Sequence, residues 1–190
     1  MKKLLEGYFK NISSLIGCIQ VTDKDGKDLD LYSALESVVR LIGVKTDEGG
    51  KLMFIGNGAS ASISSHMATD YWKNGGMRAI CFNDSAQLTC LSNDYGYDKV
   101  FEIPIQMFAD EEDVLFAISS SGASQNILNG VKAARAKGIY IITFSGFEVD
   151  NPLRFLGDFN FYVPQDSYGP VEILHLFLCH SICDAASSTD

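Results

Sequence analysis

The chain is 190 residues long, 46% hydrophobic and 21% charged, with a formal net charge of −9 at pH 7. This length suits one domain with a substantial core, and the acidic balance argues against nucleic acid as a main partner. No apolar run reaches the roughly 18–20 residues of a membrane span, the first residues show no signal-peptide pattern, and the five cysteines include no CxxC pair. We therefore expect a cytoplasmic protein with reduced cysteines and with neither nucleic-acid nor membrane partners.

Two amphipathic helices are predicted before the first strand. Apolar residues recur at helical spacing over residues 1–20 and again over residues 31–44. The charged segment 22–30, which has a central glycine, is predicted to be a turn between them. Their apolar surface is large for one small domain, so the helices either contact another subunit or pack on the sheet of the same chain.

Short apolar segments alternate with helical ones over the rest of the chain. Five are predicted to be strands: Lys51–Ile55, Met77–Phe82, Val114–Ile118, Ile139–Phe144 and Phe159–Val163. Helices are predicted from about residue 61 and over residues 83–93, 98–109, 125–137, 152–156 and 171–186, with Pro104 forcing a late start or a kink in the third of these. The alternation predicts an α/β fold, a doubly wound five-stranded parallel sheet of flavodoxin-like order 2-1-3-4-5.

Two glycine- and serine-rich loops fall at the carboxyl ends of predicted strands, where sites in such folds lie. The first, GNGAS, covers residues 56–60, and the second, SSSGAS, covers residues 119–124. Serine hydroxyls and free N–H groups at a helix N-terminus suit a phosphate dianion. Neither loop has a Walker lysine or a complete GxGxxG, which favours a phosphate monoester over a nucleotide. The alternative is that the serines only cap the helix that follows.

Four residues form two pairs that could bind a metal ion. His66 and Asp70 lie four residues apart on one predicted helix, and Glu172 and His180 lie eight apart on another, so each pair shares a helix face. Two imidazoles and two carboxylates could hold a tetrahedral zinc ion. The alternative for each pair is a surface or satisfied core group, and His175 falls off the second face.

Several segments together resemble the phosphoheptose (sedoheptulose-7-phosphate) isomerases of the sugar isomerase (SIS) domain superfamily. They are GNGAS at 56–60, the helix with His66, LSNDYGYDKVF at 91–101, DVLFAISSSGASQNIL at 113–128 and EILHLFLCHSICD at 172–184. The resemblance implies a single SIS domain over residues 1–190, with a helical oligomerisation segment at 1–50 and a sugar-phosphate-binding core at 51–190. It also implies a homotetramer with active sites between subunits.

The resemblance further implies a role for individual residues. The sugar would contact Asn57, Gly58, Ala59, Ser60, Asn93, Asp94 and Glu172, and the phosphate would contact Ser119, Ser120, Ser121 and Ser124. Zn²⁺, one ion per subunit, would be held by His66, Asp70, Glu172 and His180, of which Asp70 and His180 are also the acid/base pair. The chain departs from the family in having Asp70 in place of Glu, Glu172 in place of Gln, and Gly58-Ala59 in place of two glycines.

The implied reaction is the conversion of sedoheptulose 7-phosphate to D-glycero-D-manno-heptose 7-phosphate. Asp70 would take the C1 proton to form an enediol, and His180 would move protons between the oxygens. Two alternatives are a tetrameric, replication-initiator-binding regulator with this fold and a phosphosugar sensor without turnover. The retained acidic residue and histidines favour the enzyme.

Overall fold

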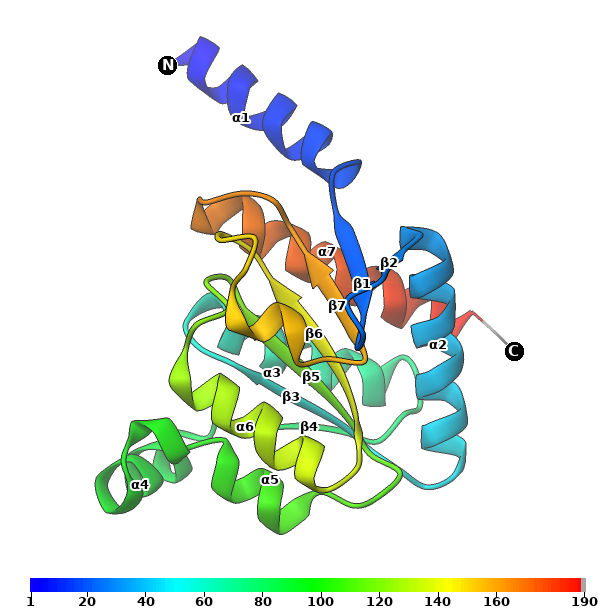
Figure 1. Cartoon of the computed structure of the whole chain (residues 1–190), viewed down its shortest axis with the longest axis vertical. Coiled ribbons are helices and arrows are strands. Elements are labelled where there is room, and N and C mark those ends of the chain that lie inside the picture. The colour runs from blue at the N-terminus through cyan, green and yellow to red at the C-terminus, as the bar shows by residue number, and fades with distance from the viewer. Residues whose placement is uncertain (189–190) are drawn as a thin grey trace.

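The computed structural model describes residues 1–188, and its centre is a single mixed sheet (Figure 1). The sheet order is β2-β1-β7-β6-β5-β3-β4. The five predicted strands are present and parallel: β3 (Leu52–Gly56), β4 (Ala79–Cys81), β5 (Val114–Ser119), β6 (Tyr140–Ser145) and β7 (Phe159–Tyr162). Taken in chain order these five lie as 2-1-3-4-5, which confirms the predicted flavodoxin-like order.

The predicted strand count of five is wrong, because the sheet has seven strands. The two extra strands are β1 (Gln20–Asp23) and β2 (Asp28–Leu29), which form an antiparallel hairpin where a turn was predicted. β1 pairs with β7 and so satisfies the backbone groups on that edge. Ile19, Val21 and Thr22 are buried and Gln20 is exposed, so this segment packs against the core and is not a solvent-exposed turn. The first helix, α1 (Lys2–Ile16), therefore ends earlier than predicted.

Helices cover both faces of the sheet, as a doubly wound fold requires (Figure 1). One face packs against α2 (Leu31–Asp47), α3 (Ala59–Lys73) and α7 (Tyr168–Ser187). The other packs against α4 (Ser85–Tyr95), α5 (Glu102–Phe108) and α6 (Gln125–Ala136). Alternate residues of β3 and β5 belong to the two cores: Phe54 and Phe116 to the first, and Met53 and Leu115 to the second.

Two 3₁₀ segments complete the chain, and one explains the proline in a predicted helix. The segment predicted as one helix over 98–109 is split into η1 (Tyr97–Lys99) and α5. Pro104 is the third residue of α5, in the first turn, where its missing N–H has no intrahelical partner to lose. The second 3₁₀ segment, η2 (Pro152–Phe155), has proline in its first turn as well.

Helix α1 projects away from the body of the domain (Figure 1). Leu15 is its single buried residue, whereas Leu4, Leu5 and Phe9 are exposed. Among residues 1–188, no helix has both the length and the apolar character that crossing a membrane requires.

Candidate active site

The two predicted loops meet in a polar pocket at the carboxyl ends of β3 and β5. The pocket has a volume of about 240 Å³. It is lined by Asn57, Gly58, Ala59, Ser60, Ser119, Ser120, Ser121, Ser124, Tyr168 and Glu172. Three helices, α3, α6 and α7, begin at or beside these residues, so their free N–H groups and positive dipole ends favour an anion there.

Glycine is required at one position in each loop. A Cβ at Gly56 would lie 2.5 Å from the backbone of Ser60, so the first loop could not turn as tightly into α3. Gly122 has φ +61°, and a Cβ there would lie 1.8 Å from Asn151 Oδ1. These contacts explain why small residues dominate both loops.

The hydroxyl groups of the serine loop make few hydrogen bonds within the protein. Ser119 and Ser120 are buried, and within residues 1–188 the buried Oγ of Ser120 has no hydrogen-bond partner. Leaving such a group unsatisfied costs about 1–3 kcal/mol. Ser121 Oγ accepts a long bond from the N–H of Ala123, at 3.3 Å. A bound anion would satisfy both hydroxyls.

Asn57 is held by side chains from two other elements. Its Nδ2 donates to Asn126 Oδ1 at 2.9 Å, and Asn126 Nδ2 donates back to Asn57 Oδ1 at 2.9 Å. The same Asn57 oxygen accepts from the hydroxyl of Tyr97 at 3.0 Å. Asn57 thus links the first loop to the start of α6 and to η1.

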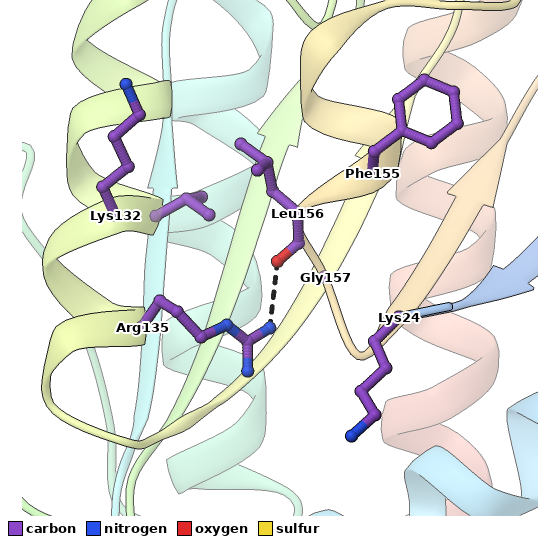
Figure 2. A pocket seen from close by; sticks show the side chains of 7 residues that line it. Lys24, Lys132, Arg135, Phe155, Leu156 and Gly157 are labelled. Carbon is purple, nitrogen blue, oxygen red and sulfur yellow. Dashed lines mark hydrogen bonds between the residues drawn. The ribbon is translucent and has the colours of Figure 1, made fainter. Parts of the chain in front are cut away.

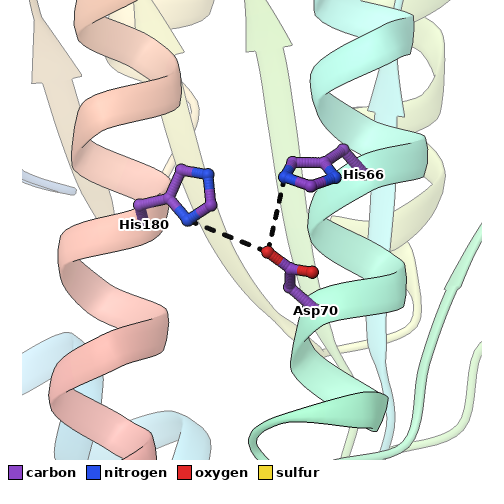
Figure 3. Close-up of side chains that lie close together, drawn as sticks. All are labelled: His66, Asp70 and His180. Atoms are coloured by element: carbon purple, nitrogen blue, oxygen red, sulfur yellow. Dashed lines mark ion pairs between the residues drawn. The ribbon is translucent and has the colours of Figure 1, made fainter.

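Figure 3 shows a second polar group, formed by His66, Asp70 and His180 between α3 and α7. Asp70 Oδ2 lies 3.4 Å from His66 Nε2 and 3.8 Å from His180 Nδ1. One ligand atom from each residue lies within 4.8 Å of the other two. Two imidazoles and one carboxylate suit a zinc ion and leave a coordination position free.

The comparisons with known proteins agree with this layout. Residues 8–146 match the SIS domain family. The phosphoheptose isomerase of Vibrio cholerae is 33% identical over 90% of this chain and 92% of its own, and that of Yersinia enterocolitica is 34% identical over 81% and 82%. The chain belongs to the phosphoheptose isomerase family.

A solved structure of the same family extends the similarity to the whole fold. Phosphoheptose isomerase GmhA from Neisseria gonorrhoeae superposes with a TM-score of 0.85 at 26% identity, over 99% of both chains. The similarity therefore includes α1 and the β1–β2 hairpin, the parts of this phosphoheptose isomerase fold that lie outside the parallel sheet.

Three residues predicted from the family do not take every position that was predicted for them. Glu172 lines the pocket and is not one of the three residues brought together with Asp70. Asn93 and Asp94 are exposed at the end of α4, bonded to each other at 2.8 Å, and do not line the pocket. They precede Tyr97, whose hydroxyl reaches Asn57.

The sequence reasoning missed three residues of this region. Asn126 and Tyr97 hold Asn57, and Tyr168 lines the pocket with its ring edge-on to Phe147 at 4.8 Å between centroids. Each contact joins segments distant in sequence, so no local periodicity could have indicated it. Phe147 has φ 60°, which is unusual for a residue other than glycine.

A larger hollow of about 460 Å³ lies between α6 and η2 and is less suited to an anion (Figure 2). Arg135 there already donates to Asp158 at 3.1 Å and to the carbonyl of Leu156 at 3.0 Å. The ammonium ends of Lys24 and Lys132 point in opposite directions in Figure 2. The smaller serine-lined pocket is therefore the candidate active site.

Proposed function

We propose that this protein is an aldose–ketose isomerase that converts sedoheptulose 7-phosphate to D-glycero-D-manno-heptose 7-phosphate through an enediol. One observation carries the proposal: a serine-lined anion pocket opens onto the same two helices, α3 and α7, that present Asp70 between two histidines. An anion pocket beside a base is what an isomerase of phosphorylated sugars needs.

The separation of the two groups suits a substrate with a phosphate at one end. Glu172, in the pocket, and His180 lie eight residues apart on α7, which corresponds to about 12 Å along the helix axis. A seven-carbon sugar phosphate held by Ser119, Ser121 and Ser124 would extend toward Asp70. The phosphate contacts would supply binding energy that positions C1 and C2.

Asp70 and His180 would carry the proton transfers. The Asp70 carboxylate would remove the C1 proton of the ketose and return a proton to C2, and His180 would move a proton between the two oxygens. Asp70 is mostly buried, with 16% of its side chain exposed, so water competes little for the carboxylate. Zn²⁺ held by His66, Asp70 and His180 would polarise the oxygens on C1 and C2.

The direct test is an assay of the purified protein on ketose phosphates with five to seven carbons, with and without a chelator. We expect the seven-carbon substrate to be turned over fastest. Asp70→Asn should lower kcat by about 10²–10⁴-fold, since an amide cannot take the proton. Asp70→Glu is the matched control and should remain active. Full activity in Asp70→Asn would contradict the assigned base.

Metal analysis tests the ligand set separately from activity. His66→Ala should lose zinc, because His66 contributes one of the three grouped ligand atoms. Comparison with Glu172→Gln then shows whether Glu172, the fourth ligand predicted from the family, joins the site. Unchanged zinc content in both His66→Ala and His180→Ala would contradict metal binding by this group.

A further inference from the structure

The two-way amide pair of Asn57 and Asn126 joins the two loops of the candidate active site. Asn57 lies in the first loop, after β3, and Asn126 is the second residue of α6, directly after the serine loop. The strands that precede the two loops, β3 and β5, are neighbours in the sheet. Asn126 is 3% exposed, so its side chain contacts the protein interior and hardly any solvent.

Among the described residues, the pair saturates both carbonyl oxygens of the two side chains and leaves one amide hydrogen free on each. Asn57 Oδ1 accepts from Asn126 and from Tyr97, and Asn126 Oδ1 accepts from Asn57 and from the backbone N–H of Ile127 at 3.0 Å. A carbonyl oxygen accepts two bonds, so both oxygens are saturated. Of the four amide hydrogens, two are used within the pair. Asn57 therefore has no acceptor capacity left for a sugar and can offer it one N–H donor.

We propose that Asn126 is a positioning residue, which through Asn57 holds the GNGAS loop against the serine loop at the spacing that a sugar phosphate requires. This inference rests on the proposed function, because it assumes a ligand that contacts both loops at once. Tyr97 steadies the pair from η1, with its hydroxyl as the third bond to the same amide. Such supporting contacts fix site geometry without touching the ligand.

The proposal distinguishes two ligands. Inorganic phosphate would contact the serine loop alone, whereas sedoheptulose 7-phosphate would contact both loops. Loosening the pair should therefore weaken the binding of sedoheptulose 7-phosphate and leave the binding of inorganic phosphate almost unchanged. A general structural defect would weaken the binding of both ligands.

The experiment measures both dissociation constants by calorimetry for the parent, Asn126→Leu and Gln125→Leu. Leucine has the same number of side-chain heavy atoms and the same branch point as asparagine but makes no hydrogen bonds. Gln125 is the exposed neighbour on the same helix. Asn126→Leu should weaken the affinity for sedoheptulose 7-phosphate by about tenfold or more and change the affinity for phosphate by less than about threefold. Tyr97→Phe should show a smaller loss in the same direction. Gln125→Leu should match the parent, and thermal unfolding should confirm that every variant is folded.

A double variant checks that Asn126 acts through Asn57. If it does, adding Asn126→Leu to Asn57→Ala should weaken the affinity for the sugar phosphate by no more than about twofold beyond the effect of Asn57→Ala alone. Equal losses for both ligands in Asn126→Leu, or none for the sugar phosphate, would overturn the proposal. A parent that binds the sugar phosphate without turning it over would overturn only the isomerase, whereas a parent that binds phosphate but no sugar phosphate would overturn both.

Discussion

At the scale of single residues, His175 shows how the core supports the end of β6. The side chain is fully buried on α7, and its Nε2–H donates to the carbonyl of Ser145 at 3.1 Å. Gly146, the next residue, donates its N–H to the carbonyl of Ser120 in the serine loop. Burial lowers the pKa of His175 from 6.5 to about 4, so the imidazole is neutral in the folded protein.

This pKa predicts a pH dependence of stability. The unfolded chain protonates His175 near pH 6.5 and the folded protein only near pH 4. Between these values the unfolded state binds more protons, so stability falls as the pH falls, by about 3 kcal/mol over the whole window. Urea unfolding from pH 7.5 to 4 should therefore show a steeper loss in the parent than in His175→Gln, which keeps an N–H donor but does not titrate. Parallel curves would contradict the assignment.

At the scale of elements, a buried ion pair links the residues just before β3 and β5, at the amino ends of these strands and opposite the candidate active site. Lys51 Nζ lies 2.6 Å from Asp113 Oδ2 and 3.0 Å from Asp110. Asp113 is 1% exposed, and its other oxygen accepts the backbone N–H of Lys51 at 2.8 Å. Removing Asp113 would leave the buried Lys51 ammonium with only the exposed Asp110 and would leave the backbone N–H of Lys51 without this acceptor.

Asp113→Ala is therefore expected to destabilise the protein by about 3–5 kcal/mol. Asp110→Ala serves as the control, because the Asp110 side chain is 84% exposed and solvent screens its interaction with Lys51. Chemical denaturation of the two variants measures the difference. Similar midpoints for both would show that the Lys51–Asp113 pair does not stabilise the sheet.

The elements also show what the sequence could and could not predict. Continuous apolar segments such as Val114–Ile118, each followed by a helical pattern, were enough to predict the five parallel strands. β2 is only two residues, Asp28–Leu29, and is a strand because it pairs with β1. The site divides in the same way: the spacing of His66 and Asp70 is visible on one helix, whereas Asn57 meets Asn126 across 69 positions.

At the scale of the whole molecule, α1 is the feature that one chain alone does not explain. Met1, Leu5 and Phe9 lie along an apolar surface of this helix, and Phe9 is 74% exposed. A helix with an exposed apolar face needs a partner surface. We propose that α1 packs against other copies of the chain in a homotetramer, as the family resemblance implies.

Phe9→Lys should therefore break the assembly, because it places a charge in the apolar face. Ser14→Lys is the matched control, since Ser14 is exposed and lies on the opposite side of α1. Sedimentation should show a tetramer for the parent and the control and smaller species for Phe9→Lys. A monomeric parent would refute the assembly.

The most direct measurement of the central claim is to incubate the protein with sedoheptulose 7-phosphate in deuterated water and follow both sugars by NMR. We predict an aldose 7-phosphate that carries deuterium at C2, because the proton that Asp70 removes from C1 exchanges with solvent before one is returned to C2. Aldose free of deuterium would contradict proton abstraction by an exchanging base. Recovery of the ketose unchanged, with hydrogen retained at C1, would contradict isomerase activity itself.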